Sequence, residues 1–428
     1  MMSLNTEIKI PDFAGEAGTR DILAAVPPTK RTAQPHMFLA FISAFTIIAS
    51  LVIMKCVALP FFWLWLAWAT VFFGAMFVVR RDWPRAILFN VGIVLCLLAG
   101  AEAYLVRYEY TPPTISPGFN VRDEVLGLAP AKSTQGHSVE RGPRGLFHGP
   151  RGQIFDVTYT IDSNGLRIAP PWHKEDSAGT LLFFGCSYTF GLGLNDNETL
   201  PYQVGAQSGG RYRISNFAFN GYSPAEMLAA IEHGMVRRAV DTPPRYAFYV
   251  AMPHHVWRVA GKISWGGFEP RYVLDANGMV HQAGYFEERQ PLAVRFGLDR
   301  RVAAQLNKSV TWRILSNSDS RLTEDDVRLY FALVRRSQEL LTAEYPGIQF
   351  QVILWPNAGA NETTLQRSAH EELQQGFRRM GISVHKVEDI LPGYKENEAK
   401  FTLSPVDSHP NALADRLLAR YVLNEVGH

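Results

Sequence analysis

The sequence predicts an α/β fold, in which helices cover both faces of a parallel sheet, preceded by three transmembrane helices. From about residue 176 onward, short apolar runs alternate with segments whose apolar residues recur at helical spacing. This βαβ rhythm is typical of a parallel sheet. Before residue 107, apolar residues instead form three long stretches, each close to the ~20 residues that a helix needs to cross a bilayer.

The three stretches span residues 37–55, 60–79 and 86–106, and they follow a tail formed by residues 1–36. At about 1.5 Å per residue, one helix through the first two would be about twice as long as the ~30 Å hydrocarbon core. We therefore expect the chain to turn back near Lys55.

Positive charge predicts the orientation of these helices. Lys30 and Arg31 precede the first stretch, and Arg80, Arg81 and Arg85 join the second to the third. Because basic loops stay in the cytoplasm, the tail is expected in the cytoplasm. Everything after the third stretch is then expected outside it.

The remainder divides into a spacer with a small strand-and-turn preface, residues 107–175, and an α/β domain, residues 176–428. Strands are expected in this domain at residues 181–185, 212–217, 246–251, 348–355 and 382–385. Helices are expected at residues 224–238, 324–344, 364–380 and 410–424.

Local signals support these elements. Thr323 is a typical N-cap residue, and Pro410 suits the first turn of a helix. In the preface, residues 154–161 alternate between apolar and polar and predict a strand. An insert at about residues 256–321 breaks the βαβ rhythm, and its Asn277-Gly278 pair predicts a hairpin. We expect the insert to cover the functional site.

Composition excludes several classes of function. The 42 basic and 40 acidic residues give a net charge of only +2, which does not favour a nucleic-acid partner. The three cysteines, Cys56, Cys96 and Cys186, suggest no disulfide framework. No Cys, His and carboxylate cluster has metal-ligand spacing, so no metal is expected. Lys55 and Glu102 are the only charged residues in the three apolar stretches, which argues against a transporter.

Two distant parts of the sequence suggest a serine nucleophile. Ser187 follows the first expected strand of the domain, and in open α/β sheets ligands bind at the carboxyl ends of strands. Near the other end of the chain, Asp407 and His409 lie two residues apart, so in an extended segment their side chains share one side. Asp407 could then orient the imidazole that accepts the Ser187 proton. The alternative is a structural turn serine with an unrelated acid and histidine in a surface loop.

At these positions the chain resembles the SGNH, or GDSL-like, hydrolase family of the membrane-anchored bacterial type. Gly185-Cys186-Ser187 resembles its first block, with cysteine in place of the usual aspartate, and Asn216–Gly221 resembles its second. The last block of the family, Asp-x-x-His-Pro, resembles the segment that ends at His409-Pro410, although here the acid lies two residues before the histidine.

The resemblance implies a flavodoxin-like three-layer fold with Ser187, His409 and Asp407 as the catalytic triad. It also implies that the backbone N–H groups of Ser187 and Gly221 contribute to an oxyanion hole. The third block normally supplies an asparagine to that hole, but the chain has His254 and His255 there. A histidine can donate a hydrogen bond, and by analogy with similar membrane-bound chains His255 is the preferred substitute. The alternative is two loop histidines without this role.

These features predict an esterase or O-acyltransferase that acts on acylated envelope glycans or lipids and needs no cofactor. The topology places its catalytic domain in the periplasm or outside the cell, anchored in a bacterial inner membrane. Three helices exceed what tethering needs, which leaves room for a membrane-protein partner. The missing asparagine supports an alternative, an inactive SGNH-like domain that binds glycan or a membrane partner in exopolysaccharide assembly.

Overall fold

The computed structural model describes most of the chain beyond the first apolar stretch. The described residues are 61–105, 113–142, 152–173, 175, 177–263, 267–286, 309, 311–312, 322–356, 364–405 and 407–426. The chain forms two compact units, one containing residues 67–93 and the other consisting mainly of residues 94–428. The apolar helices and the α/β domain are therefore two separate parts of the chain.

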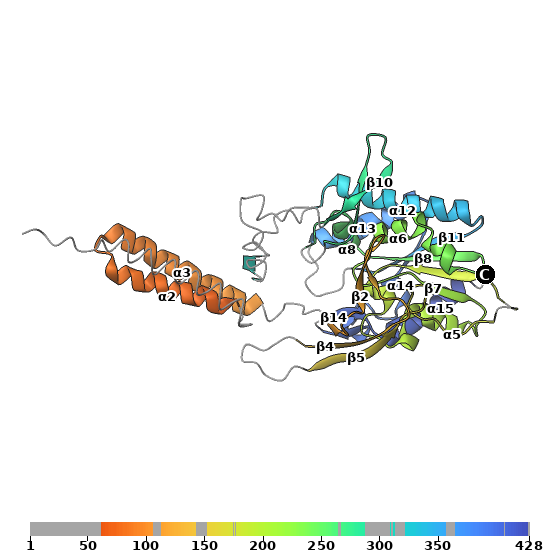
Figure 1. Ribbon diagram of the computed structural model, residues 1–428, viewed down its shortest axis with the longest axis horizontal. Helices are drawn as coiled ribbons and strands as arrows, with labels where there is room; N and C mark the ends of the chain where they lie inside the picture. Colours follow the sequence, from red (N-terminus) through yellow and green to blue (C-terminus); the bar gives the residue numbers. More distant parts are fainter. Residues whose placement is uncertain are drawn as a thin grey trace, which may run out of the picture. The chain divides into compact units, whose positions relative to one another are not determined.

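The described residues include two apolar helices, α2 (Phe62–Val78) and α3 (Asp82–Leu105) (Figure 1). The rings of Phe73 and Phe89 bring them into contact, with centroids 5.9 Å apart. By length and composition, α3 could cross a membrane, whereas α2 has only 17 residues. They match two of the predicted stretches, although α3 begins earlier than expected because Pro84 suits its first turn. The stretch at 37–55 lies outside the described residues, so three membrane-spanning helices stay a prediction.

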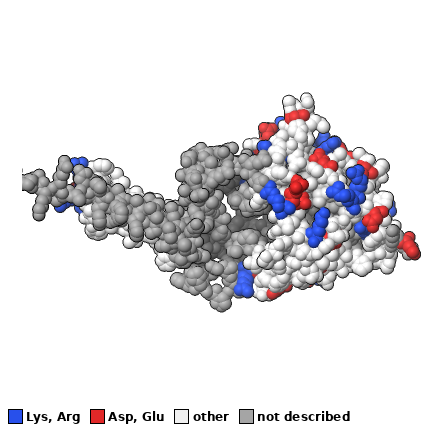
Figure 2. Space-filling model, viewed as in Figure 1, with Lys and Arg blue, Asp and Glu red and all other residues white. Residues whose placement is uncertain are grey.

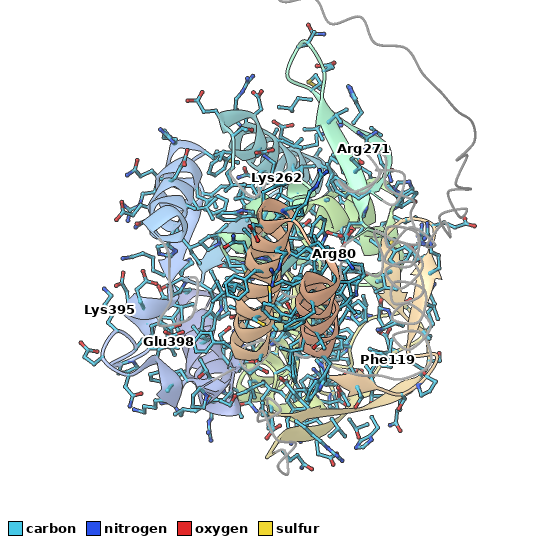
Figure 3. The ribbon with its side chains drawn as sticks, turned by 90° about the vertical axis from the view of Figure 1, so that its left-hand side faces the viewer. Arg80, Phe119, Lys262, Arg271, Lys395 and Glu398 are labelled. Carbon is cyan, nitrogen blue, oxygen red and sulfur yellow. The ribbon has the colours of Figure 1, made fainter. Side chains whose placement is uncertain are left out.

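The preface is an all-β layer. Its main sheet is antiparallel, in the order β1 (Thr114–Ile115), β4 (Gln135–Arg141) and β5 (Gln153–Thr160). A hairpin of β2 (Asn120–Asp123) and β3 (Gly127–Pro130) accompanies it. Phe119, labelled in Figure 3, is buried in this part, and its ring lies 5.9 Å from that of Tyr159 and 6.2 Å from that of Phe219 in the α/β domain. The preface is therefore packed onto the domain.

The α/β domain is built on a sheet of five parallel strands, one for each run that the sequence predicted. Its strands in chain order are β6 (Thr180–Phe184), β7 (Arg213–Asn216), β8 (Pro244–Ala251), β11 (Gln349–Leu354) and β12 (Ser383–Lys386). In space they lie in the order β12-β11-β8-β6-β7. Numbered along the chain, this is the 2-1-3-4-5 order of flavodoxin-like folds.

Helices cover both faces of the sheet (Figure 1). One layer contains α6 (Pro224–Glu232), α8 (His254–Val259), α12 (Glu324–Glu344) and α13 (Thr364–Arg379), and the other α5 (Leu200–Gln207), α14 (Val387–Ile390) and α15 (Ala412–Val426). Successive strand residues point to opposite layers. Thus Leu182 and Phe184 join one buried cluster, and Leu181 and Phe183 join the other. The predicted three-layer α/β fold is confirmed.

Two predicted helix boundaries were wrong for local reasons. The helix expected at 224–238 is divided into α6 and α7 (Met235–Ala239), because Gly234 adopts a left-handed conformation with φ 66°. The last helix starts at Ala412 rather than Pro410, because Pro410 ends a strand, β14 (Asp407–Pro410), which pairs with β13 (Thr402–Ser404). Asn411 caps the helix instead, since its side-chain oxygen accepts hydrogen bonds from the backbone N–H groups of Leu413 and Ala414.

The insert contains the predicted hairpin, formed by β9 (Pro270–Leu274) and β10 (Val280–Tyr285). Arg271, labelled in Figure 3, lies on β9. The hairpin contacts α6 and α12, and the Tyr272 hydroxyl donates to Glu232 at the end of α6. Most of the remaining insert lies outside the described residues, so its role as a cover over the site stays a prediction.

Candidate active site

Ser187 occupies the junction between β6 and a short helix, α4 (Ser187–Phe190). The turn between them needs Gly185, whose φ is 151°, because a Cβ there would lie 2.3 Å from the Thr189 hydroxyl oxygen. β6 lies between β7 and β8 in the sheet. The chain therefore adds β7 on one side of β6 and all the later strands on the other side, so the direction of strand order reverses at β6. Such a switch in strand order opens a crevice at the carboxyl ends of the strands, where open α/β sheets bind ligands.

The structure brings Ser187, His409 and Asp407 into one hydrogen-bonded row. His409 Nε2 lies 2.8 Å from Ser187 Oγ, and His409 Nδ1 lies 2.5 Å from Asp407 Oδ1. The backbone N–H of His409 also donates to Asp407 Oδ1, at 2.9 Å. Because both residues belong to β14, extended backbone lets an acid only two positions before the histidine reach its ring.

The surroundings of the row favour an ionised acid. Asp407 is only 2% exposed. Burial opposes its ionisation, but the hydrogen bonds from His409 hold the pKa of Asp407 below its usual value. Ser187 is 7% exposed. The nucleophile is therefore partly accessible, whereas its supporting acid is shielded from water.

Tyr188 fixes the histidine strand against the nucleophile. Its hydroxyl lies 3.0 Å from the Ser408 hydroxyl, and its ring centroid lies 5.0 Å from that of His409. The Trp355 ring also packs against Tyr188, with the ring centroids 5.3 Å apart. Packing of this kind limits the rotamers of His409, as a preorganised site requires.

The two backbone N–H groups predicted for the oxyanion hole follow adjacent strands of the sheet. Ser187 follows β6, and Gly221 follows the neighbouring strand β7, in a turn where its φ is 86°. Within the described residues, neither N–H has a hydrogen-bond acceptor. Free N–H groups at adjacent strand ends are the usual components of an oxyanion hole.

His255, the predicted third donor, is fully buried at the start of α8, just after β8. Its Nδ1 lies 2.6 Å from the Tyr249 hydroxyl, which lies 3.2 Å from the Tyr330 hydroxyl. Burial and the nearby Arg258 lower its pKa well below the usual value, so the ring is neutral. In the described part of the chain, Nε2 has no partner. When Tyr249 donates to Nδ1, Nε2 carries a proton that is free to be donated.

His254 differs from its neighbour in its surroundings. Its ring stacks near that of Trp257, with centroids 6.4 Å apart, and burial followed by the charge of Arg258 lowers its pKa to about 3. Tyr249 contacts His255 and not His254 through the hydrogen bonds described above. A proton on His255 Nε2 therefore requires Tyr249 to donate to Nδ1, as it does when Tyr330 donates to the Tyr249 hydroxyl. Among the described residues, no group of three or more His, Cys, Asp or Glu side chains could hold a metal ion.

Sequence reasoning gave no role to Arg167. The guanidinium of Arg167 is buried and donates to the carbonyl oxygens of Phe190, Gly191 and Leu194 at 2.6–2.7 Å. It also donates to Asp196, at 3.0 Å. This preface residue therefore holds the loop that follows the nucleophile. No local motif marks it, because its partners lie more than 20 residues away in sequence.

Replacing Arg167 by methionine is expected to lower the free energy of unfolding by about 3–5 kcal/mol, the usual cost of breaking a buried charged network. Urea titration of the full-length protein in detergent measures it. Arg328→Met is the control, because Arg328 pairs with Asp325 at an exposed site and exposed pairs contribute little. Equal stabilities for the two variants would contradict a clamping role for Arg167.

No protein-family model matches the chain, and no curated protein matches its sequence. Among solved structures, it is similar to a member of the lipolytic protein G-D-S-L family from Veillonella parvula, with 16% identity, a TM-score of 0.32 and coverage of 58% of this chain and 97% of that one. The chain is also similar to a catalytic mutant of an acetylxylan esterase from Geobacillus stearothermophilus, with 16% identity and a TM-score of 0.33. That match covers 60% of this chain and 97% of the esterase. A third similar structure is an alpha/beta hydrolase from the metagenome of Lake Arreo, Spain, with 14% identity and a TM-score of 0.32. That match covers 59% of this chain and 96% of the hydrolase.

Proposed function

We propose that the protein is a serine esterase or O-acyltransferase of the SGNH type. The observation that carries the proposal is the Ser187–His409–Asp407 row at the switch point of the sheet, with hydrogen bonds of 2.8 and 2.5 Å. A serine, a histidine and a buried acid in this order form the constellation that activates a hydroxyl for acyl transfer.

In the proposed reaction, Ser187 Oγ attacks the ester carbonyl carbon while His409 Nε2 takes its proton. Asp407 stabilises the resulting imidazolium, and the backbone N–H groups of Ser187 and Gly221 hold the negative oxygen of the tetrahedral intermediate. Its collapse breaks the ester bond, and His409 returns the proton to the departing alcohol. Water or an acceptor alcohol then resolves the acyl-enzyme by the same steps in reverse. Hydrolysis and transfer thus share every residue.

His255 is proposed as the side-chain donor to the same oxyanion. Replacing His255 by alanine is expected to lower kcat for p-nitrophenyl acetate by about 10²–10³-fold, the usual effect of losing one such donor, with little change in KM. Tyr249→Phe keeps the ring stacked but removes the hydroxyl that fixes the tautomer, so a smaller loss of kcat is expected. An increase in KM with unchanged kcat in His255→Ala would contradict the role, since it would indicate that His255 only binds the substrate in its ground state.

The proposed substrate is an acylated envelope glycan or lipid outside the cytoplasm of a bacterial inner membrane. The apolar helices and the basic residues around them support this location. On the face of the domain shown in Figure 2, acidic and basic side chains are interspersed, which does not favour a polyanionic partner there. A reporter active only outside the cytoplasm, fused after His428, tests the orientation, and an inactive reporter with normal expression would contradict it.

A binding protein without activity is the second candidate, favoured by the missing oxyanion asparagine. The two candidates are separated by incubating the full-length protein in detergent with a fluorophosphonate probe and p-nitrophenyl acetate. Mass spectrometry should locate the phosphonyl adduct on Ser187, together with ester hydrolysis. An intact, folded protein that neither binds the probe nor releases nitrophenol would support the binding role and overturn the catalytic one.

A further inference from the structure

A second acid, Glu140 on β4, lies beside the triad. Glu140 is 4% exposed, and its carboxyl group is within hydrogen-bonding reach of the Asp407 carboxylate. One oxygen of each group, Glu140 Oε2 and Asp407 Oδ2, is buried without a hydrogen-bond donor among the described residues. Two buried carboxylates facing each other would leave both oxygens unsatisfied and repel each other, which native structures avoid.

A single shared proton removes the conflict. A protonated carboxyl group has one O–H donor, so a proton on either acid would satisfy the orphan oxygen of the other. Asp407 already accepts two N–H donors from His409 through its other oxygen, and these favour its ionised form. No cation has a hydrogen bond or ion pair to Glu140 within the described residues. The proton therefore belongs on Glu140.

We infer that Glu140 is a positioning residue of the active site, a neutral carboxylic acid that donates a hydrogen bond to Asp407 Oδ2. This bond, with those from His409, fixes both oxygens of Asp407. The Asp407 carboxylate is then prevented from rotating, and its Oδ1 stays directed at His409 Nδ1. The preface then has a function in catalysis, because β4 supplies Glu140 and Arg167, also in the preface, holds the loop after the nucleophile. This role of Glu140 rests on the proposed function for its kinetic consequences but not for the shared proton itself.

Activity is expected to depend on the protonation state of Glu140. Burial, followed by the hydrogen bond and charge of Asp407, raises the pKa of Glu140 to about 9. Above that pH Glu140 ionises, its donated hydrogen bond is lost and two carboxylates face each other. Asp407 on β14 is the titratable group that raises the pKa of Glu140. The charge of Glu140 in turn raises the pKa of Tyr159 on β5. His409 contacts Asp407, and the Arg167 guanidinium lies 4.6 Å from the centre of the Tyr159 ring. Activity should therefore fall on the alkaline side.

The test compares full-length wild type with Glu140→Gln and Glu140→Ala. Glutamine keeps an N–H donor at every pH, so Glu140→Gln should retain kcat within a few-fold at pH 7 and lose the alkaline decline. Alanine removes the donor, and kcat should fall about 10- to 100-fold, as for a hydrogen bond to a charged group. If Glu140→Gln and wild type have the same alkaline limb, or if Glu140→Ala keeps full kcat while folded, the inference is overturned.

An infrared difference spectrum provides a readout that needs no activity. A buried neutral carboxyl group absorbs in the carbonyl region of a carboxylic acid, and subtraction of the Glu140→Gln spectrum should isolate its band. Subtraction is needed because burial also raises the pKa of Glu226 and of Asp415 to about 8 each. Absence of the band at pH 7 would overturn the shared proton. Its presence in a protein with no esterase activity would retain the proton and reject the proposed function.

Discussion

Replacing Ser187 by alanine in the full-length protein is expected to lower kcat for p-nitrophenyl acetate by about 10⁴-fold or more. The substitution removes the atom that forms the acyl-enzyme, and the remaining oxyanion donors can assist only a direct attack by water. Because Ser187 is nearly buried, alanine fills the same space without a new polar group. Stability should therefore change little, and fluorophosphonate labelling should disappear together with hydrolysis.

Ser337→Ala is a matched control for that experiment. Ser337 is also buried, but it lies on α12 and its hydroxyl donates to the carbonyl of Leu333 in the same helix. It should retain labelling and kcat. Unfolding curves for both variants establish that each is folded. Residual hydrolysis by Ser187→Ala above one-tenth of the wild-type rate would mean that another group is the nucleophile.

The strands of the sheet and the Asp407–His409 pair were accessible from sequence because their signals are local, whereas the meeting of this pair with Ser187 was implied by the family resemblance. Each of the five strands is a short apolar run, and Thr323 caps α12 where the capping rule places it. Asp407 and His409 are neighbours in sequence, so their mutual geometry follows once the backbone is extended. Pro410 shows the limit of such rules. It suits a helix start, but pairing of β14 with β13 decides its conformation.

Arg167 and Glu140 could not be found in this way. Each acts on residues far away in sequence, and neither belongs to a recognisable motif: Arg167 contacts the loop after α4, and Glu140 contacts an acid 267 positions later. An isolated arginine or glutamate in a sequence is usually an exposed residue. Only packing of the preface onto the domain gives these two a role, and that packing is a property of the folded chain.

Asp407→Asn is expected to reduce kcat by about 10⁴-fold while leaving the fold intact, since an equivalent change in a serine triad reverses the histidine tautomer. Two donors then compete for the single amide oxygen: the backbone N–H of His409, which donates to Asp407 Oδ1 in the wild type, and the O–H of Glu140. Where the Glu140 O–H holds the amide oxygen, the NH₂ group faces His409 Nδ1. That nitrogen must then accept, which moves the ring proton to Nε2, where it blocks transfer from Ser187.

This orientation makes the loss depend on Glu140. In Asp407→Asn combined with Glu140→Ala, the amide is free to turn its oxygen toward Nδ1, so part of the lost kcat should return. Asp415→Asn is the control for an acid-to-amide change in the core, because burial raises the pKa of Asp415 to about 8 and its carboxyl is already mostly neutral at pH 7. Steady-state kinetics at pH 7 decide the matter. A double variant no more active than Asp407→Asn would show that Glu140 does not orient residue 407.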